Sequence, residues 1–135
     1  MAGGGLSKLE EIGSALQRFK TEKPIIAVGD YYSQSQYFLA AHANEIILNP
    51  LGGVIINGFS SYRSYFKEAL DKLDITVNVF RAGQYKSAVE PLMGNSMSPQ
   101  GREETRFLLD DLWSFYSSEI EDLRSLETGT IDNYT

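Results

Sequence analysis

A short, uninterrupted apolar run, Ile-Ile-Ala-Val at residues 25–28, limits the folds open to this chain more than any other pattern in it. A run of this length without alternation is typical of a strand with both faces buried, as in a parallel sheet covered by helices. Before the run, Ser7 and Glu10 have the S-x-x-E spacing of a capping box, and apolar residues then recur at helical spacing. These patterns predict a helix over residues 8–20, followed by a strand that is buried on both faces.

The alternation of helical and strand patterns continues along the chain. Two further stretches have apolar residues at helical spacing, residues 36–43 and 62–73, and three have strand patterns, residues 46–48, 54–56 and 75–80. Asn49 and Pro50 are expected to end the first of these strands. Strands that alternate with helices favour an α/β fold with a mostly parallel sheet flanked by helices.

A long amphipathic helix is predicted near the end of the chain, with Ser98 as N-cap, Pro99 at the first helical position and an end near Arg124. Its apolar face is expected to consist of Phe107, Leu108, Leu112, Trp113, Phe115, Tyr116 and Ile120. Residues 126–135 form a C-terminal tail of unknown structure. At the other end, glycines 3–5 lead directly into the first helix with no strand before them, so we expect an incomplete domain that lacks upstream strands.

Composition excludes several classes of protein. The 135 residues allow one domain with a modest core, and eighteen acidic against twelve Lys and Arg residues give a formal charge of −6, which argues against nucleic-acid binding. Without cysteine there are no disulfides, thiolate nucleophiles or cysteine-rich zinc sites, and no His and carboxylate residues have metal-ligand spacing. No apolar run is long enough to cross a bilayer. We therefore predict no cofactor and no metal, and we expect the chain itself to be soluble.

Lys86 is the first candidate for chemistry. It lies in the irregular stretch 81–97, in the sequence Tyr-Lys-Ser-Ala-Val-Glu-Pro at residues 85–91. Burial and a nearby cation such as Arg81 would lower the pKa of the lysine, and the neutral amine could then act as a general base. The simpler interpretation is a solvated lysine, or one paired with Glu90, and the residues alone favour it.

Two serines and one histidine are the other candidates for nucleophilic chemistry. Ser33 and Ser35 lie at a predicted strand-to-helix junction, where a nucleophile can be presented above a sheet. Serine is also a favoured N-cap, and that interpretation is the better one. His42, the one histidine of the chain, lies within a predicted helix, where a partly buried structural role is expected.

The remaining groups with possible chemistry have simpler explanations. Glycines 3–5 offer free backbone N–H groups to a phosphate or an oxyanion, but the lysine and hydroxyl of a P-loop are missing. The carboxylates at residues 110–111 and 119–122 are expected to form the solvated face of the long helix. Three aromatic residues of that helix are expected to pack internally or against a neighbouring subunit: Trp113, Phe115 and Tyr116.

Taken together, several stretches of the chain resemble the long-form signal peptide peptidases of the protease IV type, peptidase family S49. The stretches are KPIIAVGD at 23–30, YSQSQYFLA at 32–40 and VFRAGQYKSAVEP at 79–91, with Asn-Pro at 49–50, LDKL at 70–73 and MSP at 97–99 in the same order. The resemblance covers most of the chain but not the tail.

The resemblance implies two tandem domains of the ClpP/crotonase type that share a Ser-Lys dyad. Residues 1–125 would be a fragment of the N-terminal repeat, which supplies Lys86 as the general base. The serine of the other repeat stands in an Ala-Ser-Gly-Gly-Tyr context, where this chain has Ser-Gln-Ser-Gln-Tyr at 33–37. Gln34 then occupies the position of the nucleophile, so neither flanking serine is expected to be one. Glycines 3–5 echo the family's oxyanion-hole glycines in position and are expected to be structural.

The resemblance also implies partners and a location. The partners would be the C-terminal serine-bearing repeat of the same protein, signal peptides as substrates, and further copies in a homo-oligomer. The full-length protein would be membrane-associated, on the periplasmic side of the inner membrane. Two other functions stay open: a non-catalytic oligomerisation module built on the aromatic helix from Pro99 onward, and a crotonase-type enzyme acting on acyl-CoA, which rests on fold analogy alone.

Overall fold

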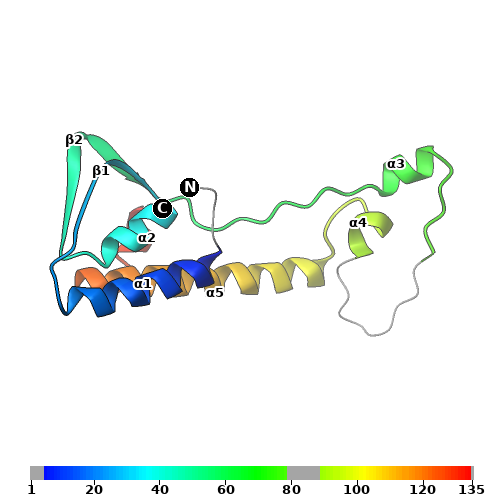
Figure 1. Ribbon diagram of the computed structural model, residues 1–135. Helices are drawn as coiled ribbons and strands as arrows, with labels where there is room; N and C mark the ends of the chain where they lie inside the picture. Colours follow the sequence, from blue (N-terminus) through cyan, green and yellow to red (C-terminus); the bar gives the residue numbers. More distant parts are fainter. Residues whose placement is uncertain (1–4, 79–88, 135) are drawn as a thin grey trace. The chain divides into compact units, whose positions relative to one another are not determined.

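The computed structural model describes residues 5–78 and 89–134. The elements, drawn in Figure 1, are α1 (Leu6–Lys20), β1 (Ile26–Ser33), α2 (Gln34–Ala41), β2 (Glu45–Ile55), α3 (Lys67–Lys72), α4 (Glu90–Met93), α5 (Pro99–Arg124) and the 3₁₀ helix η2 (Ile131–Tyr134). They form two compact units, one made of Met1–Gly58 with Trp113–Thr135 and one made of Phe59–Leu112. Helix α5 contributes residues to both units.

The sheet of the first unit consists of two parallel strands, β1 and β2. The prediction of separate strands at 46–48 and 54–56 is wrong, because β2 runs through both stretches. Pairing is regular up to Gly29, opposite Leu48, and resumes at Tyr31, opposite Gly53. Four residues of β2, 49–52, therefore lie opposite one residue of β1.

The irregularity in the sheet explains how a strand can contain Asn49 and Pro50. Asn49 Nδ2 donates to Asp30 Oδ1 at 3.0 Å, and the backbone N–H of Leu51 donates to Asn49 Oδ1 at 3.0 Å. A Cβ on Gly52 would lie 1.7 Å from the backbone oxygen of Asp30, so only glycine fits there. The missing N–H of proline falls where the ladder is already interrupted, so the strand continues beyond it.

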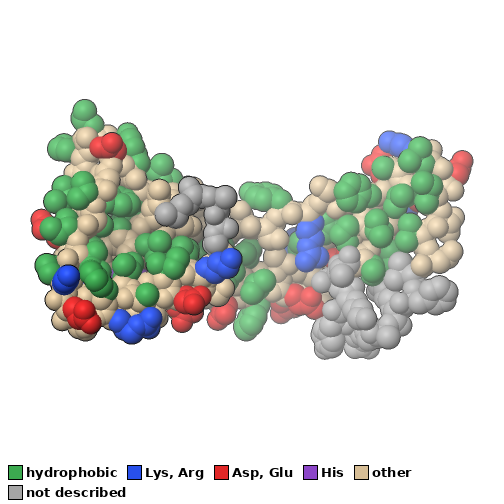
Figure 2. All heavy atoms as spheres, in the orientation of Figure 1, with side chains coloured by type: hydrophobic (Ala, Val, Ile, Leu, Met, Phe, Trp, Pro, Cys, Tyr) green, Lys and Arg blue, Asp and Glu red, His purple; other side chains and the backbone are tan. Residues whose placement is uncertain are grey.

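The prediction that the strand at residues 25–28 is buried on both faces is wrong for this structure. Val28 is 71% exposed and Ile26 is 55% exposed. Helix α2 packs against both strands, but the side chains on the other face of the two-stranded sheet lie at the surface. Figure 2 shows hydrophobic side chains gathered at the surface over β1 and β2.

The core of the first unit lies between α2 and the C-terminal half of α5. Phe38, which is fully buried, stacks on Tyr116 with ring centroids 5.8 Å apart and lies 6.2 Å from Phe115. Ile120 and Ile131 are also buried there. This cluster confirms that the aromatic residues of the long helix pack internally from Phe115 onward, whereas Phe107, in the second unit, is 77% exposed.

Helix α1 begins two residues earlier than predicted, and the predicted capping box is wrong. Gly5 is the N-cap, and its carbonyl accepts from the backbone N–H groups of Lys8 and Leu9 at 2.9 and 3.3 Å. Ser7 consequently lies inside the first turn of the helix, where its hydroxyl cannot cap the helix.

The second unit is less regular than its sequence pattern predicts. Of the predicted helical stretch 62–73, only α3 is helical, and Tyr62 is 92% exposed. The predicted strand at 75–80 is wrong over residues 75–78, and residues 79–80 lie outside the described residues. A strand needs a partner, and none of the described residues pairs with 75–78.

Helix α5 confirms the prediction for both of its ends. The hydroxyl of Ser98 accepts from the N–H of Gly101 at 3.0 Å, Pro99 is the first helical residue, and Arg124 is the last.

The structure as a whole confirms a mixed α/β fold with a parallel sheet flanked by helices. The ClpP/crotonase type, the upstream strands and the domain boundary at residue 125 stay predictions.

Candidate functional site

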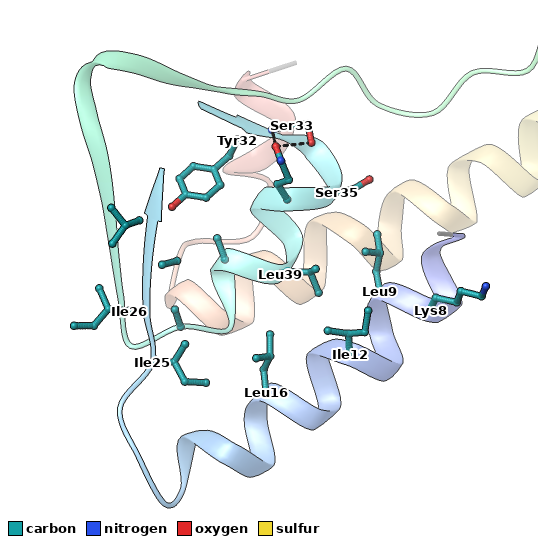
Figure 3. Close-up of a pocket in the computed structure, with 15 residues that line it drawn as sticks. Lys8, Leu9, Ile12, Leu16, Ile25, Ile26, Tyr32, Ser33, Ser35 and Leu39 are labelled. Atoms are coloured by element: carbon teal, nitrogen blue, oxygen red, sulfur yellow. Dashed lines mark hydrogen bonds between the residues drawn. The ribbon is translucent and has the colours of Figure 1, made fainter. Parts of the chain in front are cut away.

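An apolar groove lies between α1, β1 and α2 in the first unit (Figure 3). Its volume is about 530 Å³, and its lining is mostly aliphatic, with Ile12, Leu16, Ile25, Val28 and Leu39 among the lining residues. The ring of Tyr32 packs over Gly29, where a Cβ would lie 3.0 Å from the ring, and the Tyr32 hydroxyl has no hydrogen-bond partner among the described residues. Such a groove can hold apolar groups but offers little acid-base chemistry.

Ser33 caps α2, which confirms the simpler interpretation of this residue. Strand β1 ends at Ser33 and α2 begins at the next residue. The backbone N–H and the hydroxyl of Ser33 both donate to Gln36 Oε1, at 2.9 and 3.0 Å (Figure 3). The nearest basic residue of the groove, Lys8, extends outward from α1 rather than toward Ser33 (Figure 3). The hydroxyl of Ser33 is therefore held by a carboxamide and not by a base.

Gln34 stands at the strand-to-helix junction, where a nucleophile would be presented. Its side-chain Oε1 accepts from the backbone N–H of Asn57 at 3.1 Å, just beyond the end of β2. Its carbonyl accepts from the Tyr116 hydroxyl at 3.1 Å. Both contacts are structural, and a carboxamide cannot attack a carbonyl carbon. Gln34 therefore has a structural role at the strand-to-helix junction.

His42 has the structural role that was predicted for it. It is 2% exposed, its Nδ1–H donates to the Phe38 carbonyl at 3.0 Å, and its Nε2 lies 4.0 Å from Glu119 Oε1. Helix α1 approaches the ring so closely that a Cβ on Gly13 would lie 2.3 Å from Nε2. The ring thus packs where α1, α2 and α5 meet.

The prediction that residues 119–122 form a solvated face is wrong for Glu121. This residue is 5% exposed, and its carboxylate accepts from the backbone N–H groups of Gly129 at 3.1 Å and Ile131 at 2.9 Å. The C-terminal segment folds back onto α5, and its free N–H groups need acceptors. Asp110 and Asp111 are exposed, as predicted.

The aromatic pair Trp113 and Tyr116 belongs to the packing of the first unit. Their rings stack 5.6 Å apart, and Trp113 Nε1 donates to Asp132 Oδ1 at 2.6 Å. Burial raises the pKa of Tyr116 above its ordinary range, and the nearby phenol of Tyr37 adds to this effect. These contacts fix η2 and α2 on α5, so the aromatic residues here are structural.

Only some of the residues predicted to carry the chemistry are among the described residues. Lys86 and Arg81 lie outside the described residues, as do the first two of glycines 3–5. The end of the lysine motif is described: Glu90 and Pro91 begin α4, and the Glu90 carboxylate contacts Ser98. Sequence reasoning missed this last contact, although both residues lie in stretches that it singled out.

Residues 5–78 and 89–134 contain no group of three or more His, Asp or Glu side chains that could hold a metal ion. No helix within these ranges is both long and apolar enough to span a membrane.

A family model decides the relationship of the chain to known proteins. Residues 17–135 match the model of peptidase family S49. The chain belongs to peptidase family S49. This match includes the motif around Lys86, the strand-to-helix junction and the C-terminal segment that folds back onto α5.

Relatives of this family S49 chain have protease names. It is 44% identical over 130 residues to Protease 4 of Haemophilus influenzae and 42% identical over 125 residues to Protease 4 of Salmonella typhi. It is 27% identical over 131 residues to the chloroplastic serine protease SPPA of Arabidopsis thaliana. These matches cover 96%, 92% and 96% of the chain, but only 21%, 20% and 19% of the relatives. The family S49 chain therefore spans about a fifth of their length.

Proposed function

We propose that this chain is the lysine-bearing part of a serine endopeptidase that degrades cleaved signal peptides, with Lys86 as the general base. The observation that carries the proposal is the Tyr-Lys-Ser-Ala-Val-Glu-Pro sequence at residues 85–91, inside the region that matches family S49. The protease names of the relatives support a peptidase reaction. The serine nucleophile comes from a second repeat of the same protein.

The reaction follows from the chemistry of a neutral amine beside a serine. Lys86 Nζ takes the proton of the serine hydroxyl as the serine oxygen attacks the peptide carbonyl carbon. The C–N bond then breaks, and the Lys86 ammonium gives its proton to the leaving amine. In the second half of the reaction, Lys86 accepts a proton from a water molecule that attacks the acyl carbon. The ester C–O bond then breaks, and the Lys86 ammonium returns its proton to the serine oxygen.

The environment of Gln34 supports the division of labour between two repeats. Gln34 begins the helix directly after β1, which is where a nucleophile would be presented, and its carboxamide holds the backbone of Asn57. A unit built this way does not supply the serine itself. We extend the proposal to a ClpP/crotonase-type fold for each repeat and to a homo-oligomer on the periplasmic side of the inner membrane.

The test is a peptidase assay of the full-length protein that carries Lys86→Ala. We expect kcat to fall by about a thousandfold or more, because removal of a general base costs about two to four orders of magnitude. Lys72→Ala is the matched control, since Lys72 is an exposed lysine on α3 whose partner is Glu68, four residues earlier in the chain. The proposal fails if Lys86→Ala turns over peptides as fast as this control.

A further inference from the structure

The end of the lysine motif is fastened to the start of α5 by a cluster that we name the Glu90–Ser98 clasp, made of Glu90, Ser98 and Gly101. The hydroxyl of Ser98 donates to Glu90 Oε1 at 2.5 Å, and the backbone N–H of Ser98 lies 3.4 Å from Glu90 Oε2. The same hydroxyl accepts from the N–H of Gly101 at 3.0 Å. One hydroxyl thus joins the carboxylate of the motif to the first turn of α5.

The charge of Glu90 suits this position. The N-terminus of α5 carries the positive end of the helix dipole, and a carboxylate is favoured beside it. A hydrogen bond to an ionised acceptor is also stronger than one between neutral groups. Both effects stabilise the hydrogen bonds between the Glu90 carboxylate and Ser98.

Gly101 makes room for the clasp. It is buried, and a Cβ at this position would lie 2.9 Å from Glu90 Oε2 and 3.2 Å from both Glu90 Oε1 and Ser98 Oγ. Any side chain larger than hydrogen would push the carboxylate away from Ser98. The close approach explains a glycine in the first turn of a helix, where glycine otherwise lowers helix stability.

A second bond fixes the next residue of the motif. The carbonyl of Pro91 accepts from the backbone N–H of Phe66 at 2.7 Å, at the residue that precedes α3. Two successive residues of the motif are thus held by two different elements of the second unit, one by its side chain and one by its backbone.

From this geometry we propose that Glu90 is a positioning residue for the general base. Lys86 precedes Glu90 by only four residues in the sequence, so an anchor at Glu90 is a fixed point close to the lysine along the chain. Fixing Glu90 narrows the places that the lysine can occupy before it meets the serine. The inference rests on the proposed function, since it presupposes that Lys86 is the base.

The clasp differs from an ion pair between Glu90 and Lys86 in what it predicts. In a clasp, the role of the carboxylate is to accept from Ser98, so a carboxamide can replace it and loss of the Ser98 hydroxyl harms the enzyme. In an ion pair, Glu90→Gln would remove the negative charge that stabilises the ammonium, and the acid limb of the pH profile would move to lower pH. Ser98 would then matter little.

The experiment measures kcat, KM and the pH profile of kcat/KM for variants of the full-length protein. We expect Glu90→Ala and Ser98→Ala each to lower kcat by about tenfold or more, since a misplaced catalytic group can cost about a hundredfold, while KM changes less than about twofold. Glu90→Gln should restore most of kcat with an unmoved acid limb. The double variant Glu90→Ala with Ser98→Ala should be no slower than Glu90→Ala, because both break the same contact.

Three controls separate the possible outcomes. Glu103→Gln removes an exposed carboxylate from the same end of α5 and should leave kcat unchanged. The unfolding temperature of each variant identifies those that fail to fold. If Glu90→Ala is among them, Ser98→Ala, which removes only one oxygen atom, decides the test. Lys86→Ala separates the two proposals: if it is active, the proposed function fails. If it is inactive while Ser98→Ala keeps full kcat, or Glu90→Gln shifts the acid limb, only the clasp is overturned.

Discussion

At the scale of single residues, the first unit depends on polar groups that are buried with their partners. Tyr116 is 1% exposed, and its hydroxyl donates to the Gln34 carbonyl at 3.1 Å, which ties the long helix to the strand-to-helix junction. Burial raises the pKa of this phenol, with Tyr37 as a smaller cause. The hydroxyl therefore stabilises the fold only while it keeps its proton.

Tyr116→Phe tests this role through its pH dependence. At about pH 8 the substitution should lower the free energy of unfolding by about 1 kcal/mol, because one buried hydrogen bond is lost. Above about pH 10 the unfolded wild-type chain releases the phenol proton while the folded chain keeps it, so the stability of the wild type falls as pH rises. The deficit of Tyr116→Phe should therefore shrink in urea titrations above pH 10, whereas the exposed control Tyr134→Phe should show no such trend. A deficit that stays constant across this range would contradict the prediction.

Residue roles were predictable where their partners are near in sequence. The N-caps Ser33 and Ser98 each bond within three residues, so a local pattern identifies them. The prediction for Glu121 was wrong because its partners, Gly129 and Ile131, lie eight and ten residues later in the sequence, in a segment that folds back onto α5. The role of Gln34 came from the family resemblance, and its contact with Asn57 follows from the structure alone.

At the scale of elements, one buried carboxylate of α5 holds the C-terminal segment at two points. Glu121 accepts from two backbone N–H groups of the segment, and Trp113 Nε1 donates to Asp132, which lies in η2. A tail of unknown structure in the sequence is thus an ordered part of the first unit. Strand β2 also differs from its prediction for a structural reason. Asn49 and Pro50 predict the end of a strand, but they lie in the part of β2 that does not pair with β1.

Glu121→Ala should release the C-terminal segment from α5. The substitution leaves the N–H groups of Gly129 and Ile131 without their acceptor, and we expect the free energy of unfolding to fall by about 1–3 kcal/mol. Hydrogen exchange of these two amides should become faster. The exchange rates of the β1 amides should change only as far as the loss of global stability requires. Asp122→Ala, at an exposed neighbouring position, is the control. Equal exchange in both variants would show that Glu121 does not hold the segment.

At the scale of the whole molecule, the chain accounts for about a fifth of the length of its relatives. A two-stranded sheet with exposed side chains such as Val28 and Leu51 is a small base for an α/β domain, since isolated pairs of strands are marginally stable. The buried strand predicted from residues 25–28 assumed covering layers on both faces, and the structure shows one. Periodicity identifies a strand, but burial depends on neighbours that are not encoded in the same stretch.

The proposed division of labour between two repeats leads to a prediction for the chain by itself. Its strand-to-helix junction carries Gln34, and the Ser33 hydroxyl is bonded to the Gln36 carboxamide rather than to a base. We expect the isolated 135-residue chain to show no labelling by a serine-directed fluorophosphonate and no peptidase activity. The full-length protein should be labelled on a serine outside this chain, and Lys86→Ala should slow that labelling, because the probe reports on the activated nucleophile. Labelling of Ser33 or Ser35 in the isolated chain would overturn the split dyad and would place the nucleophile at the junction itself.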